Sequence, residues 1–94
     1  MLIVDSFYAG PNPFKTEVTF GFNGAGAASQ MTVAIYTFSG GLLWETTLID
    51  VSEVTWDGIT DGGTPLANGG YIYVITATDG TNTFSDTGKV FVNR

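Results

Sequence analysis

The side chains best suited to chemistry are three oxygen-bearing residues in one Gly-rich stretch, residues 56–74. Asp57, Asp61 and Asn68 carry the kind of oxygen that Ca²⁺ prefers as a ligand, and the glycines beside them free nearby carbonyl groups. Their spacing does not follow the D-x-[DN]-x-[DN]-G pattern of a known calcium loop. Asp and Asn side chains in turns more often accept backbone N–H groups. We therefore expect these residues to shape the loop, and they remain only a weak calcium candidate.

Catalysis is not expected from this composition. The chain has no His and no Cys, which excludes Ser-His-Asp and Cys-His nucleophilic sites and zinc sites built from these residues. Asp57 and Asp61 form the only close pair of acids in a shaped loop. A glycosidase needs two carboxyl groups across a substrate cleft, which short strands hardly provide. We predict a protein that is not an enzyme, with no catalytic residue and no cofactor.

The charge balance bears on the partners. The formal net charge is −6, and the basic residues are Lys15, Lys89 and Arg94. Nucleic acids and anionic membrane surfaces attract clusters of Lys and Arg, so neither is an expected partner. No stretch approaches the roughly 18 apolar residues of a membrane span, and none is predicted. Residues 1–5 lack the basic region of a signal peptide, so we expect an exported form to derive from a longer precursor.

The segments that position these side chains are predicted to be short strands. Alternating, β-branched and aromatic residues predict seven of them, at 2–8, 17–22, 31–38, 42–49, 53–56, 70–78 and 83–92. Residues 23–30 are predicted to form a loop, with 24–29 as its mobile middle. Seven strands over residues 1–94 predict a single all-β domain, an immunoglobulin-like antiparallel β-sandwich. A small open barrel is the alternative architecture.

Strand alternation also predicts which side chains are buried. The expected core contains Phe20, Phe22, Val33, Ile35, Trp56, Tyr71 and Tyr73. The alternative for the aromatic residues is a carbohydrate-stacking surface, formed by Trp56, Tyr71, Tyr73, Phe84 and Phe91. Tyr36 and Phe38 fall on the face opposite Val33 and Ile35. An exposed apolar patch there would suit docking against a neighbouring domain or subunit.

The first eight residues allow two interpretations. They are mostly apolar, carry Asp5 as their one charge, and precede the Pro11-Asn12-Pro13 kink. In one interpretation they pair within their own sandwich or form a linker from a preceding domain. In the other they are an exchangeable strand that pairs with a neighbour's sheet edge, with Ile3 and Phe7 filling pockets.

A set of motifs along residues 8–92 carries a family resemblance through its order and spacing. The motifs are Pro11-Asn12-Pro13-Phe14, Ile35-Tyr36, Ser39-Gly40, Trp56-Asp57-Gly58, Asp61, Gly63, Gly69 and Tyr71-Ile72-Tyr73, with Lys89 opening the final apolar run. The chain resembles the immunoglobulin-like domain first described in the flagellar hook-capping protein (the FlgD type). It is more loosely similar to the C-terminal sorting domains of type IX secretion cargo. Lys15, Thr37 and Gly70 depart from the family pattern.

The resemblance implies an exported bacterial module, extracellular or at the cell surface, that is not catalytic. Such a module would act as a spacer, an assembly unit, or a C-terminal attachment and sorting domain of a larger protein. Its expected partners are other domains of the same precursor or neighbouring subunits. The alternative is an accessory carbohydrate-binding module of a secreted polysaccharide-degrading enzyme, with a cell-surface polysaccharide as ligand.

Overall fold

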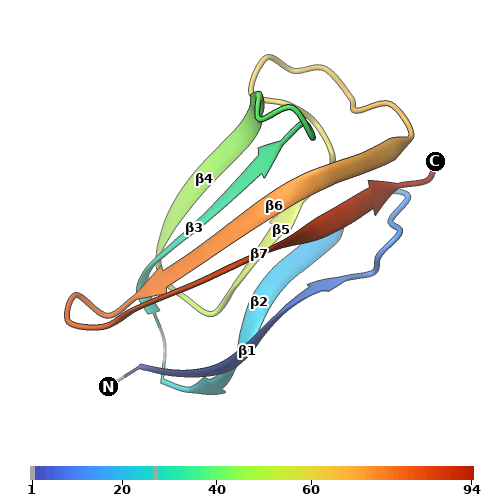
Figure 1. The fold of residues 1–94 in the computed structure, drawn as a ribbon. Helices are drawn as coiled ribbons and strands as arrows, with labels where there is room; N and C mark the ends of the chain where they lie inside the picture. Colours follow the sequence, from blue (N-terminus) through green and yellow to red (C-terminus); the bar gives the residue numbers. More distant parts are fainter. Residues whose placement is uncertain (1, 27) are drawn as a thin grey trace.

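The chain folds into two antiparallel β-sheets packed face to face (Figure 1). The computed structural model describes residues 2–26 and 28–94. The strands are β1 (Ile3–Gly10), β2 (Val18–Ala25), β3 (Ala28–Tyr36), β4 (Leu42–Val51), β5 (Glu53–Trp56), β6 (Gly69–Thr78) and β7 (Thr83–Val92). One sheet has the order β1-β2-β5 and the other β4-β3-β6-β7. This arrangement confirms the predicted immunoglobulin-like sandwich, and the open-barrel alternative is wrong.

The hydrophobic core lies between the two sheets because alternate side chains of each strand point inward. On β2, Phe20 and Phe22 are buried, whereas the hydroxyl of Thr19 lies 2.9 Å from that of Thr55 on the outer face. The buried core side chains are Leu2, Phe14, Val18, Phe20, Phe22, Ala28, Met31, Val33, Ile35, Val54, Trp56, Leu66, Ile75, Ala77, Val90 and Val92. Both ends of the chain therefore contribute to one core.

Two of the expected core residues are less buried than predicted. Tyr71 and Tyr73 are only partly buried, whereas the other five are buried as expected. Both tyrosines pack against the core from β6, next to the edge strand β7, so their hydroxyl ends reach the side of the sandwich. The ring of Tyr73 packs on Phe20 with 5.3 Å between ring centroids, while the Tyr71 hydroxyl donates a 2.7 Å hydrogen bond to the Ala67 carbonyl. Strand alternation correctly predicts that both side chains point inward, but it does not predict how deeply they are buried.

The predicted loop at residues 23–30 is wrong for most of its length. Strand β2 continues to Ala25 and β3 begins at Ala28, and Ala27 lies outside the described residues. Gly, Ala and Ser have low strand propensity, which is why the sequence predicts a loop there. The end of β2 pairs with β1, and the start of β3 pairs with both β4 and β6. These backbone hydrogen bonds override the low strand propensity. In addition, β1 extends to Gly10, and β3 ends at Tyr36 rather than at Phe38.

Asp79 fixes the turn between β6 and β7 and also holds the start of β1. One carboxylate oxygen accepts the N–H groups of Asn82 and Thr81 at 2.7 and 2.9 Å. The other oxygen accepts the N–H of Leu2 at 3.0 Å. These hydrogen bonds, the one from Asn82 foremost, lower the pKa of Asp79 from 3.8 to about 2. A single side chain therefore ties the N-terminal strand to the last hairpin.

The pH dependence of stability should reveal this arrangement. Because the pKa of Asp79 is lower in the folded state, its stabilising effect is complete above the unfolded pKa of 3.8 and is lost as pH falls towards 2. Urea unfolding of the wild type and of Asp79→Asn, measured across this window, should show a difference that shrinks with falling pH. A difference that stays constant from pH 4 to pH 2 would show that the ionised carboxylate is not what stabilises the turn.

Candidate functional site

Trp56 is the centre of an aromatic stack at one end of the sandwich. Its side chain is buried, and the ring stacks on Trp44 of β4 with 5.1 Å between ring centroids and an interplanar angle of 23°. Phe14 packs on it with its ring centroid 5.8 Å away, and the indole N–H donates a 2.9 Å hydrogen bond to the Ile59 carbonyl. Trp44 was not singled out in the sequence, although its position on the inward face of β4 is a signal that could have found it.

The three calcium candidates bond to three different parts of the backbone. Asp57 accepts the N–H of Ile59 at 3.1 Å, which is an Asx turn inside the loop. Asp61 accepts the N–H of Glu45 at 3.3 Å, and Asn68 accepts the N–H of Arg94 at 2.8 Å. Within the described part of the chain, no three acidic side chains come close enough to hold a metal ion. The geometry favours a turn-fixing role, and the expectation that the loop has no tight calcium site stays a prediction.

Gly58 and Arg94 explain why this loop can pack so closely. The backbone of Gly58 has φ of 78°, and a Cβ there would lie 3.1 Å from the ring of Phe14 and against the Arg94 guanidinium. That guanidinium donates hydrogen bonds to the carbonyls of Gly58 and Leu66, both at 3.2 Å, and to that of Lys15 at 3.4 Å. The Arg94 side chain thus joins residues 57–68, here called the Trp56 loop, to the chain just after the Pro-Asn-Pro segment. Sequence reasoning missed this role of Arg94.

The Pro11-Asn12-Pro13-Phe14 segment moves the chain from one sheet to the other. Gly10 still pairs with β2, whereas Asn12 bonds to β7: its amide donates to the Lys89 carbonyl and accepts the N–H of Phe91, both at 2.9 Å. Phe14 continues beside β7 in a parallel bridge to Val92, and its side chain is fully buried. The family motif is therefore a structural device that closes one side of the sandwich.

The outer face of the four-stranded sheet carries an exposed aromatic patch. We define the patch as Tyr36, Phe38, Ile72, Lys89 and Phe91, arranged around Gly70. Phe38 and Phe91 are 59% and 43% exposed. A Cβ on Gly70 would lie 2.8 Å from the ring of Phe38 and 2.9 Å from that of Phe91, so the absence of a side chain there lets both rings lie close to the strand. Gly70 is one of the positions that depart from the pattern of the resembled family, and a side chain there would displace these rings.

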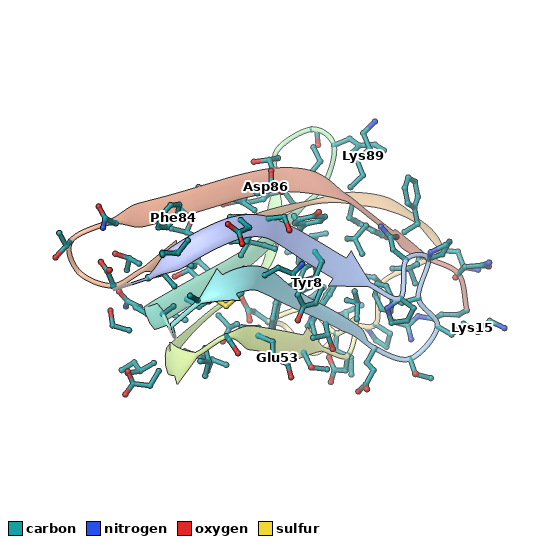
Figure 2. The ribbon with its side chains drawn as sticks, turned by 90° about the horizontal axis from the view of Figure 1, so that it is seen from below. Tyr8, Lys15, Glu53, Phe84, Asp86 and Lys89 are labelled. Atoms are coloured by element: carbon teal, nitrogen blue, oxygen red, sulfur yellow. The ribbon has the colours of Figure 1, made fainter. Side chains whose placement is uncertain are left out.

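One cation borders this aromatic patch. The Lys89 ammonium lies 5.9 Å from the centroid of the Phe38 ring, a cation–π distance. Lys89 pairs with Ile72 across β6 and β7, and Ile72 pairs with Tyr36 across β6 and β3. Figure 2 shows Lys89 on the side of β7 away from β1. The structure thus brings together Tyr36 and Phe38, the two residues expected to dock against a neighbour, although Tyr36 is half-buried.

The aromatic residues of the carbohydrate hypothesis do not form one surface. Trp56 is buried, and Tyr71 and Tyr73 pack against the core. Phe84 also packs against the core, at the side of the sandwich. Phe91 alone of the five belongs to the exposed patch. A stacking platform would have to be built on Phe91 with Phe38, which was not among the expected sugar-binding residues.

Two hollows flank the sandwich. One, of about 390 Å³, lies where β1 and β7 run side by side, and is lined by residues 4–7 and 84–86 (Figure 2). The other, of about 660 Å³, lies between the start of β4 and the Trp56 loop, and is lined mainly by apolar residues at 42–43 and 60–67.

Ile3 and Phe7, the two β1 side chains of the strand-exchange interpretation, lie in different surroundings. Ile3 is 47% exposed, whereas Phe7 packs edge-on against Phe22 with ring centroids 6.4 Å apart. In this structure β1 pairs with its own β2, and its exchange with a neighbour stays a prediction.

Solved structures resemble the chain across most of its length. A region of dimeric latent PorU from Porphyromonas gingivalis matches with a TM-score of 0.73 and 24% identity, covering 92% of this chain and 9% of that one. A region of PorZ, a surface component of the type IX secretion system of the same organism, matches with a TM-score of 0.65 and 28% identity, covering 96% of this chain and 12% of PorZ. The chain thus corresponds to a small part of either protein.

A third structure, of a differently named protein, shares the fold. CopC from Methylosinus trichosporium OB3b matches with a TM-score of 0.63 and 15% identity over 94% of both chains. At the identities of PorU and CopC, the likeness shows the fold alone. No curated protein matches the chain in sequence. Among the described residues there is also no helix long and apolar enough to cross a membrane.

A family model settles the relationship that the motifs suggest. The model of the FlgD Ig-like domain matches residues 12–81, well over half of the chain. The matched region begins in the Pro-Asn-Pro segment and includes the whole Trp56 loop and the Tyr71-Ile72-Tyr73 run. Phe14 and Trp56 anchor the first two of these elements to the core, and Tyr71 and Tyr73 pack against it. The chain therefore belongs to the FlgD Ig-like domain family.

Proposed function

We propose that this domain is a non-catalytic module of an exported bacterial surface protein, and that it docks against a neighbouring domain of that protein through the aromatic patch. Membership of the FlgD Ig-like family supports a structural role. The likeness to small regions of PorU and PorZ supports an origin within a larger protein. The description of PorZ as a bacterial surface component supports a location at or outside the cell surface.

The observation that carries the proposal is the exposure of Phe38 and Phe91 side by side on an otherwise complete sandwich. Their side chains are 59% and 43% exposed, whereas other aromatic residues of the chain are buried in the core. Exposed apolar patches on soluble domains mark interaction sites more often than not. Aromatic side chains are also enriched at the centres of interfaces, and a Lys beside them suits the polar rim.

Charge complementarity indicates the chemistry of the partner surface. Lys89 is the cation of the patch, in a chain with a net charge of −6. We therefore expect the partner domain to present an apolar side chain to the two phenyl rings and a carboxylate to Lys89. Such a pair would fix the orientation of the contact more than its affinity.

Hydrogen exchange in the full-length protein tests this proposal. We expect backbone amides of residues 36–42 and 70–72 to exchange more slowly in the full-length protein than in the isolated 94-residue chain. The double variant Phe38→Ser and Phe91→Ser should abolish the difference. The variant Ile3→Ser, which removes an exposed side chain from the other sheet, should preserve it. Equal exchange of these segments in the two wild-type proteins would contradict the docking function.

The carbohydrate-binding alternative makes a different prediction in the same variants. A sugar that stacks on Phe38 and Phe91 would bind the isolated domain, with no need for a neighbouring domain. Binding of a soluble polysaccharide by the wild-type domain and its loss in the double variant would favour that function. We place it second because four of its five aromatic residues, Trp56 among them, lie in or against the core.

A further inference from the structure

A two-sheet sandwich has four edge strands, and in this molecule they are not equally protected. The edges are β1 and β5 in one sheet and β4 and β7 in the other. An edge strand presents unpaired N–H and C=O groups that can pair with another chain. Natural domains protect such edges with charges, bulges, short strands or covering loops. Comparing the four edges therefore identifies the one that remains open.

Three of the edges carry a recognisable protection. On β1, the pairing register shifts between Val4 and Ser6, so Asp5 stands at a bulge. Strand β5 has only four residues and begins with a charged one, Glu53. On β7, the last residues are covered by the side chain of Asn12 and the backbone of Phe14. Further along β7, Asp86 pairs with the buried Ile75, and an inward-pointing charge on an edge disfavours addition of another strand.

Strand β4 is covered only at its beginning. The N–H of Asp61 donates to the Leu43 carbonyl at 3.2 Å, and its carboxylate accepts the N–H of Glu45 at 3.3 Å. Leu43 and Glu45 therefore point their backbone groups away from β3, and by strand alternation so do Thr47 and Ile49. Within residues 2–26 and 28–94, no backbone partner covers the outward groups of Thr47 and Ile49. The open edge is therefore short and defined.

The side chains of this open edge are unusually apolar. Residues 46–49 read Thr-Thr-Leu-Ile and include no charge and no Pro. Ile49 is 72% exposed, the largest value among the exposed large apolar side chains of the described chain, and Leu48 is 39% exposed. The strand ends just beyond, where Asp50 adopts a φ of 57°. The N–H and C=O groups of Thr47 and Ile49 thus form a short pairing site. It is bounded on one side by Glu45, which Asp61 covers, and on the other by Asp50.

We propose that β4 pairs with β4 of a second copy of this domain, antiparallel and centred on Leu48. This register places Thr47 opposite Ile49 of the second copy, and each such pair exchanges two backbone hydrogen bonds. Leu48 then faces Leu48 of the second copy. The two four-stranded sheets join into one continuous sheet across a two-fold axis, which is the usual symmetry of a homodimer.

The charges and the loop contacts select both the partner and the register. Centred on Leu48, Glu45 lies opposite Val51 of the second copy and Asp50 opposite Thr46, so no carboxylate faces another despite the net charge of −6. Thr47 and Ile49 form a β-branched cross-strand pair, which favours pairing. A register centred on Thr47 would instead require the N–H of Glu45, which Asp61 already occupies. The edge is therefore complementary to itself in one register.

A single introduced cysteine reports this register directly, because the chain has none of its own. Leu48 and its counterpart form a non-hydrogen-bonded pair with Cα atoms about 4.5 Å apart, within the range for a disulfide. We expect Leu48→Cys to form a disulfide-linked dimer under mild oxidation. Ile49→Cys should cross-link far less, since its counterpart lies diagonally across the pair at about 7–8 Å or more.

The comparison of these neighbouring variants separates pairing from random collision. Collision would favour Ile49→Cys, whose position is more exposed than that of Leu48→Cys. Equal cross-linking of the two, or more from Ile49→Cys, would overturn the proposal. A third variant, Phe38→Cys, lies on the aromatic patch and should cross-link no better than Ile49→Cys.

Sedimentation velocity on the unmodified chain provides the second test. We expect a dimer fraction that rises with concentration and is lost in Leu48→Lys, which places two ammonium groups opposite each other. Ile3→Lys, a matched change on the β1 edge, should leave the dimer fraction unchanged, and circular dichroism should show that both variants are folded. A strictly monomeric wild type at all concentrations would refute the pairing. Such a result would leave docking through the aromatic patch unaffected, because the two surfaces share no residue.

Discussion

Replacing Trp56 with alanine is expected to lower the free energy of unfolding by about 3–5 kcal/mol. The indole is 2% exposed and contacts Trp44 and Phe14, so truncation leaves a cavity that these two rings cannot fill without leaving their own packed positions. It also leaves the Ile59 carbonyl without its hydrogen-bond donor. Because a domain has roughly 5–15 kcal/mol of stability in total, the variant should unfold at a much lower urea concentration.

Two further variants separate the contributions of the ring and of the N–H group. Trp56→Phe keeps an aromatic ring but loses the indole N–H and part of the volume, so we expect a smaller loss than for alanine. Phe38→Ala removes an aromatic ring that is 59% exposed, and we expect a loss below about 1 kcal/mol. If Trp56→Ala were no more harmful than Phe38→Ala, Trp56 would not anchor the loop.

Phe14→Ala is the second variant for which we expect a loss of about 3–5 kcal/mol. Phe14 is completely buried, and it follows the Pro-Asn-Pro segment that leads the chain from the end of β1 to the edge of β7. Its backbone donates to the Phe91 carbonyl and accepts the N–H of Asn93, both at 2.9 Å, so the side chain anchors a segment that closes the sheet edge. Equilibrium urea unfolding measures the loss.

A double-mutant cycle of Phe14 and Trp56 tests whether the two rings stabilise the fold together, as one cluster, or independently of each other. Phe14 and Trp56 are in direct contact, with ring centroids 5.8 Å apart, so we expect the double alanine variant to lose less than the sum of the single losses. Phe14→Leu should retain most of the stability, because it keeps an apolar side chain of moderate volume in the same place. Additive losses in the cycle would show that the two residues stabilise separate parts of the fold.

The family motifs have a common physical role in this structure. Asn12 covers the end of the β7 edge, and Asp61 covers the beginning of the β4 edge. Each belongs to a loop that is held against the core by an aromatic residue, Phe14 in one case and Trp56 in the other. The motifs that identify the family therefore protect both edges of the four-stranded sheet, each over a part of its length. Their shared position at the sheet edges is a structural reason for these motifs to accompany the fold.

What the chain encodes locally could be predicted from its sequence. Alternation along residues 18–22 and 31–35 predicts buried Phe20 and Ile35, because neighbouring side chains of a strand must point to opposite faces. The Asp79-Gly80 turn is equally local, since an Asp side chain can bond to the backbone of the next few residues without help from the rest of the fold. Seven strands of this kind leave few compact arrangements other than a sandwich.

Only the tertiary structure decided which distant groups meet. Residues 24–25 and 28–30 have poor strand propensity and become strands because their neighbours supply hydrogen bonds. Trp44 and Trp56 are twelve residues apart along the chain, and Arg94 bonds to carbonyls far earlier in it, so no local pattern reveals either contact. The protection of an edge strand is likewise a property of the loop that lies beside it in space. The sequence alone determined most of the strands and their inward faces, whereas long-range packing extended two strands through residues of low propensity and left the edge at Leu48 open.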